Sequence, residues 1–428
     1  MKKLFAVLLA LVMVFALAAP VASADDAVSI TLWTYPIGGW GNSDTVDALI
    51  AGFEAANPGI KVTVEYLAYA DGDDKVNTAI EGGNAPDLVM EGPERLVANW
   101  GAKGYMVDIA ELWDDADKQE ILPVVAAACF NADGASYEYP LCMTAHCMAV
   151  NLTRFQAVGA DQYLNLDTHT WTTDDFVAAV ALLAAENPNV AAIYCSGQGG
   201  DQGTRALINN LYGGTFTNPE HSMYTADSAE NIKALELLAG LEGVNFDAAI
   251  NGGEEIQLFR QGILDMAFCW NIGMQLNTDN NDAGLTNDGD EIVCMAFPSD
   301  DGVPELCGGI WGFGIFNNGN DAKIEAAKTF IKYMADSAAT ADAVKASTYF
   351  PVRDSSDDVD LSKLYEGNDI MSEYGKLMPF LGDYYQVVPG WAEARTAWWN
   401  MLQQIGSGAD VTEAVTAFCE TANAAAMG

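Results

Sequence analysis

The chain has 428 residues, of which 50% are hydrophobic, so it can bury more than one sizeable core. Its 60 Asp and Glu residues against 19 Lys and Arg give a formal net charge of −41 at pH 7. This balance excludes nucleic acids and anionic lipid surfaces as main partners, because both are bound through clustered Lys and Arg. The chain also has neither repeats nor low-complexity stalks, which disfavours a surface-structural role.

The first 24 residues have the pattern of an export signal. Lys2-Lys3 precedes an apolar run over residues 4–19, and Ala22-Ser23-Ala24 supplies the small residues before a cleavage site. The run is too short for a comfortable membrane span, and no second run follows. We predict cleavage after Ala24 and a mature protein that is periplasmic or extracellular. No cysteine stands at the end of the run, so a lipid anchor is not predicted.

The chain then alternates between strand and helix patterns. Asn42 can cap a first helix that Asn57-Pro58-Gly59 ends, and a second helix is predicted over residues 75–81. Strands are predicted at 28–34, 60–66 and 88–90. Strand, helix, strand, helix, strand with short links predicts a right-handed, doubly wound parallel sheet.

Aromatic and acidic side chains follow the ends of these three strands. Tyr35 and Trp40 follow the first strand, Tyr69 follows the second and Glu91 follows the third. Ligands of open parallel sheets bind beyond the carboxyl ends of the strands. We therefore expect these four residues to share one rim of a binding site.

A second αβ pattern follows the buried apolar run at residues 139–151. Residues 171–176 start a helix with a cap and early acids, and residues 190–195 form a short strand. The glycine loop at 197–203 lacks both G-x-G-x-x-G and the Walker A lysine, so no nucleotide is predicted there. A strand at 291–298 and an amphipathic helix at 322–334 are expected later in the chain.

Several segments, taken in order, resemble one family of binding proteins. They are the GNAPDLV turn at 83–89, the loop at 104–109, YPLCMTAHCMAVN at 139–151, the helix start at 171–176, the strand at 259–270, the glycine strand at 306–315 and ASTYFPVR at 346–353. Their order is similar to that in the extracellular solute-binding proteins of ABC importers, which include maltodextrin-binding and glycerol-phosphate-binding proteins. One departure is Leu264-Asp265, where the family has a smaller pair.

The resemblance implies an α/β, two-lobed periplasmic-binding-protein-like fold of type II. Each lobe would be a doubly wound, mixed or parallel sheet flanked by helices, with the ligand cleft between the lobes. We expect residues 25–141 and 300–349 in the N-terminal lobe, and residues 145–294 and 352–428 in the C-terminal lobe. Hinge crossings are expected near 139–144, 294–299 and 348–352, because a hinge needs a few element-terminal residues that absorb dihedral change.

The resemblance also implies which residues bind the ligand. Besides the rim residues Tyr35, Trp40, Tyr69 and Glu91, the cleft-side positions are Thr144, Trp270, Asn271, Gly309, Trp311, Tyr349, Tyr384, Tyr385 and Trp391. Aromatic rings can stack on the apolar faces of sugars while polar groups bind their hydroxyls, so the ligand is expected to be a neutral carbohydrate. We expect about half of these rings to touch the ligand and the others to belong to the core.

The predicted function is capture of a sugar or oligosaccharide and its delivery to the permease of an ABC importer. The protein would be a monomer that binds no nucleic acid and needs no cofactor. Glycerol phosphate or another polyol is the alternative ligand, although only Arg353 and Arg395 lie near cleft segments to bind a phosphate. An exported glycan-cleaving enzyme is a further alternative, but the chain has three histidines and no G-x-S-x-G elbow, so no enzyme is predicted.

Metal and disulfide signals are weak. Cys142, His146 and Cys147 lack the second ligand pair of a structural zinc site. Residues 279–290 resemble a calcium loop only in part, since position five is Ala283 and the last ligand is Asp290. No metal is therefore predicted. The eight cysteines are spread without a compact framework, and their pairing stays open.

Overall fold

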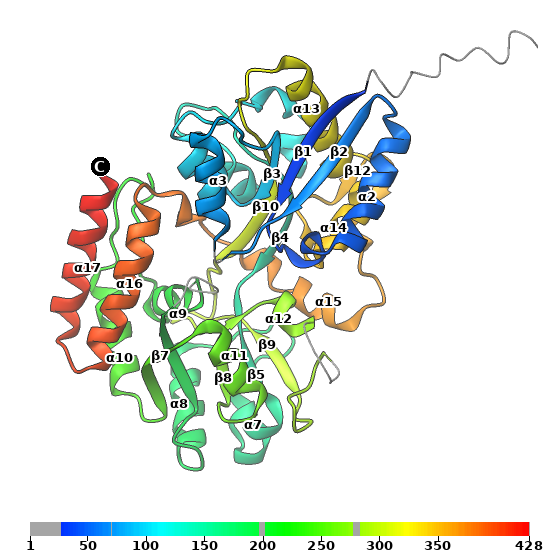
Figure 1. Cartoon of the computed structure of the whole chain (residues 1–428). Helices are drawn as coiled ribbons and strands as arrows, with labels where there is room; N and C mark the ends of the chain where they lie inside the picture. Colours follow the sequence, from blue (N-terminus) through cyan, green and yellow to red (C-terminus); the bar gives the residue numbers. More distant parts are fainter. Residues whose placement is uncertain (1–26, 70, 197–201, 277–282, 428) are drawn as a thin grey trace, which may run out of the picture.

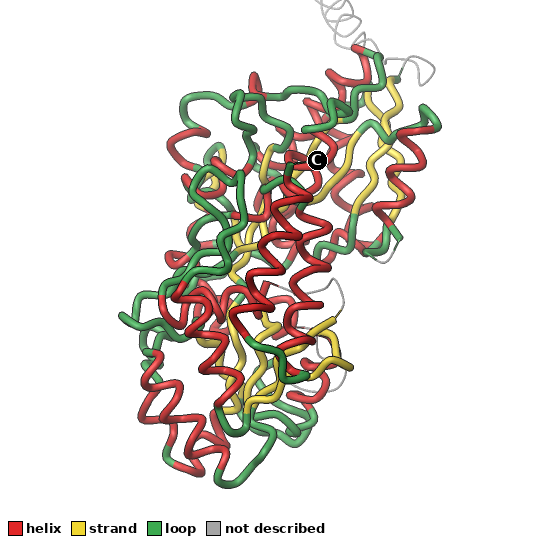
Figure 2. Tube along the Cα trace, turned by 90° about the vertical axis from the view of Figure 1, so that its left-hand side faces the viewer, coloured by secondary structure: helices red, strands yellow, loops and turns green. Residues whose placement is uncertain are grey.

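The computed structural model describes residues 27–69, 71–196, 202–276 and 283–427. Figure 1 shows two lobes, one above the other, and Figure 2 shows strands in each lobe with helices beside them. The predicted export signal and most of the glycine loop at 197–203 lie outside the described residues. Within the described residues, no helix has the length and apolar character of a membrane span.

The first lobe contains a six-stranded sheet in the order β11-β4-β10-β3-β1-β2. β1 (Val28–Thr34) pairs in parallel with both β2 (Ile60–Tyr66) and β3 (Leu88–Glu91). β10 (Gly308–Ile315) runs antiparallel between β3 and β4 (Tyr139–Ala145), and β11 (Phe350–Pro351) pairs with the outer side of β4. The predicted α/β fold with a mixed sheet is confirmed. The parallel part comes from the first three strands.

Helices flank this sheet, with α3 on one side of β1 in Figure 1 and α2 with α14 on the other. The predicted cap of α2 forms, because the Asn42 side chain accepts a hydrogen bond from the Asp44 N–H at 2.9 Å. Val46, Ile50 and Phe53 then bury one face of this helix. The helical elements of the lobe are η2 (Gly38–Gly41), α2 (Ser43–Ala56), α3 (Gly72–Glu81), α4 (Pro93–Arg95), the π-helical turn η3 (Leu96–Gly101), η4 (Ala110–Leu112), α5 (Asp117–Glu120), α6 (Pro123–Ala128), α13 (Asp321–Ala335) and α14 (Thr340–Ser347).

The second lobe contains two smaller sheets. β5 (Cys147–Asn151) lies between β8 (Met266–Trp270) and β9 (Ile292–Met295), both antiparallel to it. β6 (Ala191–Ser196) pairs in parallel with β7 (Val244–Asn251). The two sheets adjoin, because the N–H groups of Asp265 and Met266 both bond to the Val190 carbonyl just before β6.

The capped helix start predicted at residues 171–176 is present in the second lobe. Thr172 and Asp175 form a capping box at the start of α8. The helical elements are α7 (Leu152–Val158), η5 (Ala160–Tyr163), α8 (Thr173–Ala184), α9 (Gln202–Tyr212), α10 (Ala229–Gly240), α11 (Gly252–Arg260), α12 (Ile272–Leu276), η8 (Tyr385–Val387), α16 (Trp391–Gly406) and α17 (Val411–Ala426).

Three stretches of chain pass between the lobes. β4 continues into β5 through His146, whose N–H bonds to the Cys307 carbonyl on the second passage, residues 296–307. The third passage follows the short strands β12 (Ser355–Ser356) and β13 (Val359–Asp360) and the turn η6 (Leu361–Lys363). It leads into α15 (Asp369–Gly375) and η7 (Met378–Phe380). α15 is attached to the second lobe, because His169 Nε2 lies 2.5 Å from Glu373 Oε2. The hinge segment predicted at 348–352 lies before this third passage.

All eight cysteines are buried, and none of them forms a disulfide. Cys142 lies on β4 in the first lobe and Cys195 on β6 in the second. Burial raises the pKa of each of these two thiols to about 12. Neither thiol is therefore a nucleophile at neutral pH in the folded protein.

Candidate functional site

An arginine surrounded by acids and aromatic rings lies at the carboxyl ends of β1 and β3. Arg95 donates from Nε to Asp73 Oδ1 at 2.7 Å and from Nη1 to Glu91 Oε1 at 2.9 Å, and Glu94 Oε1 is 3.3 Å from Nη1. Its guanidinium also lies 5.2 Å from the ring centre of Tyr35. We call Tyr35, Tyr69, Asp73, Glu91, Glu94 and Arg95 the Arg95 cluster.

The predicted rim residues Tyr35, Tyr69 and Glu91 come together in this cluster. The rings of Tyr35 and Tyr69 stack at 5.3 Å between centres, and Tyr35 donates from its hydroxyl to Asp73. Tyr69 remains 44% exposed, so part of its side chain is accessible to a ligand. Arg95, Asp73 and Glu94 were missed by sequence reasoning, although the spacing of Glu91 and Arg95 is that of an i,i+4 ion pair.

Carboxylates outnumber cations inside this region. Glu138, which immediately precedes β4, is fully buried, and neither of its side-chain oxygens has a hydrogen-bond partner among the described residues. Burial, together with the charges of Glu94 and Glu91, raises its pKa well above the usual range. Burial also raises the pKa of Glu91 to about 8, although Arg95 lowers it. Arg95 therefore does not neutralise all the acids around it.

A second pair of rings lies beside the cluster on β10 and just before β11. The rings of Trp311 and Tyr349 stack at 4.7 Å with an angle of 14° between their planes. Gly309 makes room for this pair, because a Cβ atom there would lie 2.2 Å from the Trp311 ring. Gly309 also pairs with the buried Thr144 across the sheet. Four predicted residues therefore meet here.

Tyr349 also reaches the second lobe. A Cβ atom on Gly273 would lie 3.1 Å from the Tyr349 hydroxyl oxygen, which places this hydroxyl against the start of α12. The predicted Asn271 caps that helix, accepting hydrogen bonds from the N–H groups of Gly273 and Met274. Burial raises the pKa of Tyr349, with smaller contributions from Cys142 and from Glu91 of the Arg95 cluster. These contacts bring the second ring pair close to both lobes.

The remaining predicted residues, which lie just before α16 or at its first position, fall into two environments. Tyr384 donates from its hydroxyl to Glu94 Oε2 at 2.6 Å, and so connects this segment with the Arg95 cluster. Tyr385 and Trp391 instead surround the buried Arg205, whose guanidinium lies 4.7 Å from the Trp391 ring centre. Sequence reasoning missed Arg205, because no local pattern marks it.

Two predicted residues lie in the core. Trp40 has no exposed surface and donates from Nε1 to the Ala343 carbonyl at 3.0 Å. Trp270 is equally buried, donates to Gln275 Oε1 at 3.0 Å and packs edge-on against Phe259. Both rings have their polar atom satisfied within the protein, so their contribution in this structure is to packing.

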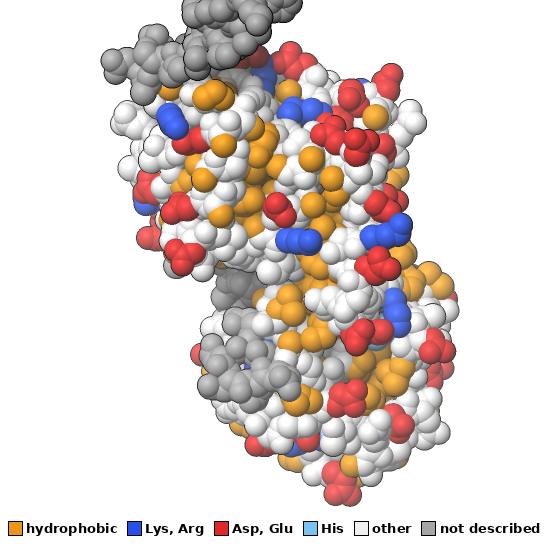
Figure 3. Space-filling view, turned by 90° about the vertical axis from the view of Figure 1, so that its right-hand side faces the viewer, with side chains coloured by type: hydrophobic (Ala, Val, Ile, Leu, Met, Phe, Trp, Pro, Cys, Tyr) orange, Lys and Arg blue, Asp and Glu red, His pale blue; other side chains and the backbone are white. Residues whose placement is uncertain are grey.

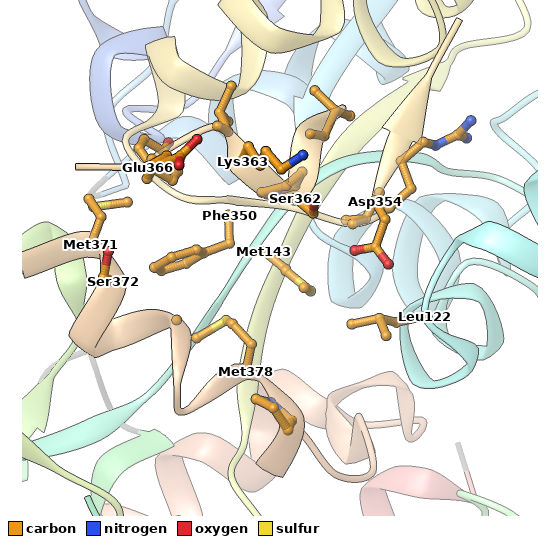
Figure 4. Close-up of a pocket in the computed structure, with 18 of the residues that line it drawn as sticks. Leu122, Met143, Phe350, Asp354, Ser362, Lys363, Glu366, Met371, Ser372 and Met378 are labelled. Atoms are coloured by element: carbon orange, nitrogen blue, oxygen red, sulfur yellow. The ribbon is translucent and has the colours of Figure 1, made fainter. Parts of the chain in front are cut away.

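A pocket of about 710 Å³ lies beside the third passage. Figure 4 shows Met143, Phe350, Met371 and Met378 around a hollow, with Lys363 on the segment across it. It contains none of the predicted ligand residues, and its walls are mainly apolar. This chemistry does not suit a ligand rich in hydroxyl groups. Among the described residues, no group of three or more His, Cys, Asp or Glu side chains is arranged to hold a metal ion.

The geometry defines a class of protein: two α/β lobes, joined by three passages, with acids and stacked rings where the lobes meet. This is the architecture of a two-lobed binding protein. A family model described as bacterial extracellular solute-binding protein matches residues 39–341. The chain belongs to this family of ABC-transporter binding proteins, as its sequence resemblance predicted.

Solved structures share the fold across nearly the whole chain. The GacH receptor of Streptomyces glaucescens, solved with acarbose, is 17% identical with a TM-score of 0.71, covering 92% of this chain and 97% of its own. A solute-binding protein from Thermotoga lettingae bound to α-D-tagatose is 18% identical with a TM-score of 0.70, covering 94% and 100%. One from Agrobacterium radiobacter K84 in complex with ribitol is 20% identical with a TM-score of 0.69, covering 93% and 99%. Among curated proteins, no significant match was found.

Proposed function

We propose that the protein captures a neutral carbohydrate between its lobes and delivers it to the permease of an ABC importer. The observation that carries this proposal is the combination of aromatic rings, including the 44% exposed Tyr69, with the acids of the Arg95 cluster where the lobes meet. Tyr69 offers an exposed ring beside Glu91, and the Trp311–Tyr349 pair offers a second platform. Rings stack on the apolar faces of sugars, and carboxylates accept hydrogen bonds from their hydroxyls. The protein would act as an exported monomer and catalyse no reaction.

The charges around Arg95 favour a neutral ligand over a phosphorylated one. Phosphate is bound through arginine forks or clustered lysines. Arg95 is already engaged by Asp73, Glu91 and Glu94, so a phosphate here would meet more negative than positive charge. Arg353, which could have served instead, is engaged by Asp117 and Asp336.

A panel of ligands tests the proposed function. Thermal unfolding is measured with maltotriose, D-tagatose, ribitol and glycerol 3-phosphate, and each mixture is then analysed for cleavage products. We expect at least one neutral sugar to raise Tm without being consumed, because a ligand that binds only the folded state stabilises it. Preference for glycerol phosphate over every neutral compound, or the release of new reducing ends, would contradict the proposal.

Replacing Trp311 with alanine is expected to weaken binding of the sugar found in this panel. The ring would lose most of its buried contact, about 1 to 3 kcal/mol, which is about 5- to 150-fold in Kd. Isothermal titration calorimetry measures the change. Tyr105→Ala is the matched control, because Tyr105 is an exposed aromatic residue of the first lobe outside the proposed site. Equal affinities of the two variants would remove Trp311 from the site.

Closure of the lobes on the ligand is the other expected property. The proposed hinge segments, 139–144, 294–299 and 348–352, stand at or near the three passages, where a few residues can absorb a rotation. Small-angle X-ray scattering should show a smaller radius of gyration when saturating sugar is added. An unchanged radius at saturation would argue against closure.

A further inference from the structure

One hydrogen bond beside the Arg95 cluster connects segments from the two ends of the chain. Tyr384 donates from its hydroxyl to Glu94 Oε2 at 2.6 Å. Glu94 lies on α4, which follows β3 in the first lobe and contacts η8 of the second. Seen from the right-hand side of Figure 1, the two lobes meet along a narrow waist (Figure 3). The acceptor of this bond therefore belongs to the first lobe, at the place where the lobes touch.

The donor, Tyr384, is held in the second lobe by both of its neighbours in the chain. Asp383 Oδ2 lies 2.7 Å from Nε2 of His221, which stands on the loop between α9 and α10. On the other side, the ring of Tyr385 packs against that of Phe216, with 5.2 Å between the ring centres. Tyr384 must therefore move with the second lobe, while its acceptor moves with the first.

The Tyr384 hydroxyl is well placed to donate to a carboxylate. Tyr384 is 5% exposed, and the side chain of Glu94 is 14% exposed, so water competes little for either group. Burial raises the pKa of Tyr384 well above its usual range, and the charge of Glu94 raises it further. The hydroxyl therefore keeps its proton. Hydrogen bonds to an ionised acceptor are stronger than those between neutral groups.

Glu94 connects this bond with the rest of the Arg95 cluster. Its other oxygen, Oε1, is 3.3 Å from Arg95 Nη1, and Arg95 also binds Asp73 and Glu91. One carboxylate thus contacts the second lobe through one oxygen and the proposed sugar site through the other. Because donor and acceptor belong to different lobes, separation of the lobes breaks the bond, and closure forms it.

We infer that the Tyr384–Glu94 hydrogen bond is a latch that stabilises the closed arrangement of the lobes. The inference rests on the proposed function, because it concerns how readily the same sugar site closes. Both partners are protein groups, so the latch acts with or without a ligand. It shifts the equilibrium between open and closed molecules, and the apparent affinity of every ligand that needs the closed state changes in proportion to the population of that state. Tyr384 is thus a positioning residue with the same effect on all such ligands.

The first test needs no ligand. Small-angle X-ray scattering of the ligand-free protein should give a larger radius of gyration for Tyr384→Phe than for the wild type, because phenylalanine keeps the ring and removes only the donor. Tyr224→Phe is the matched control, since the Tyr224 hydroxyl donates to the Pro389 carbonyl at 3.0 Å within the second lobe. This variant should keep the wild-type radius. Equal radii for Tyr384→Phe and the wild type would overturn the latch, whether or not the protein binds a sugar.

The second test is calorimetry with maltotriose, D-tagatose and ribitol. For each compound that binds, Tyr384→Phe should raise Kd by the same factor, about threefold to tenfold, which corresponds to one lost hydrogen bond. In a Glu94→Ala background the same substitution should leave Kd unchanged, because its partner is already missing.

Two results of this calorimetry would contradict the latch. A factor that differs between compounds would assign Tyr384 to direct ligand contact, and an equal loss of affinity in the Glu94→Ala background would show that the hydroxyl acts through another group. If none of the three compounds binds, the proposed function fails, while the scattering of the ligand-free variants still decides whether the latch exists.

Discussion

Glu138→Gln is expected to stabilise the protein increasingly as the pH rises. Glu138 is fully buried without a hydrogen-bond partner among the described residues, and burial raises the pKa of its carboxyl group well above the usual range. Between the unfolded and folded pKa values, the folded state keeps a proton that the unfolded state has lost. The wild-type protein therefore loses stability as pH rises through this window, by about 1.4 kcal/mol per pH unit. Glutamine mimics the protonated acid and does not titrate.

The measurement is urea unfolding of the wild type and the variant across this pH range. The free energy of unfolding of Glu138→Gln, relative to wild type, should rise with pH above about pH 5, by about 1.4 kcal/mol per pH unit for as long as Glu138 keeps its proton in the folded protein. The exposed Glu236 on α10 supplies the control, since Glu236→Gln should give a difference that does not change with pH. A pH-independent difference for Glu138→Gln would mean that Glu138 is ionised in the folded protein.

Arg353→Met is expected to destabilise the protein by about 3 to 5 kcal/mol. Arg353 donates from Nη2 to Asp117 Oδ1 at 2.8 Å and from Nη1 to Asp336 Oδ1 at 2.7 Å. Asp117 is 1% exposed, so removing the guanidinium leaves a buried carboxylate with Lys332 at 3.4 Å as its remaining cation. An unpaired buried charge costs far more than the ion pair contributes.

Urea unfolding with a constant m-value would measure this loss. Lys363→Met is the matched control, because Lys363 pairs with Asp360 on the surface, and exposed pairs contribute about 0 to 1 kcal/mol. Adding Asp117→Asn to Arg353→Met should recover part of the stability by removing the stranded charge. If Arg353→Met lowers the free energy of unfolding as little as the surface control does, then Arg353 does not stabilise the buried Asp117 carboxylate.

The fold was predictable because its signals are local or ordered along the chain. The alternating patterns at 28–34 and 60–66 form β1 and β2, which pair side by side. Asn42 and Thr172 cap the helices that follow them. Such patterns depend only on neighbouring residues, so they can be recognised without knowledge of the rest of the structure. The order of the later segments then indicated the family, and membership of this family implied the two-lobed architecture.

The environment of each ring was less predictable, because it depends on distant segments. Trp40 and Tyr35 follow the same strand, yet Trp40 is held by Ala343 on α14, about 300 residues later in the chain. No sequence pattern near Trp40 predicts that contact. The same holds for Glu138, because no local pattern indicates that its carboxyl group is buried without a hydrogen-bond partner among the described residues. Arg95 could more easily have been predicted, because its partner Glu91 is only four residues earlier in the chain.

The rate at which a buried thiol reacts with a modifying reagent reports how often the lobe around it opens. Cys142 on β4 and Cys195 on β6 are shielded from solvent, so a thiol-modifying reagent can reach either one only after the surrounding structure opens. Mass spectrometry of peptides from the labelled protein would give a separate reaction rate for each cysteine. Comparing the two rates, with and without ligand, would reveal which lobe opens first and which one the ligand protects, and it requires no engineered cysteine.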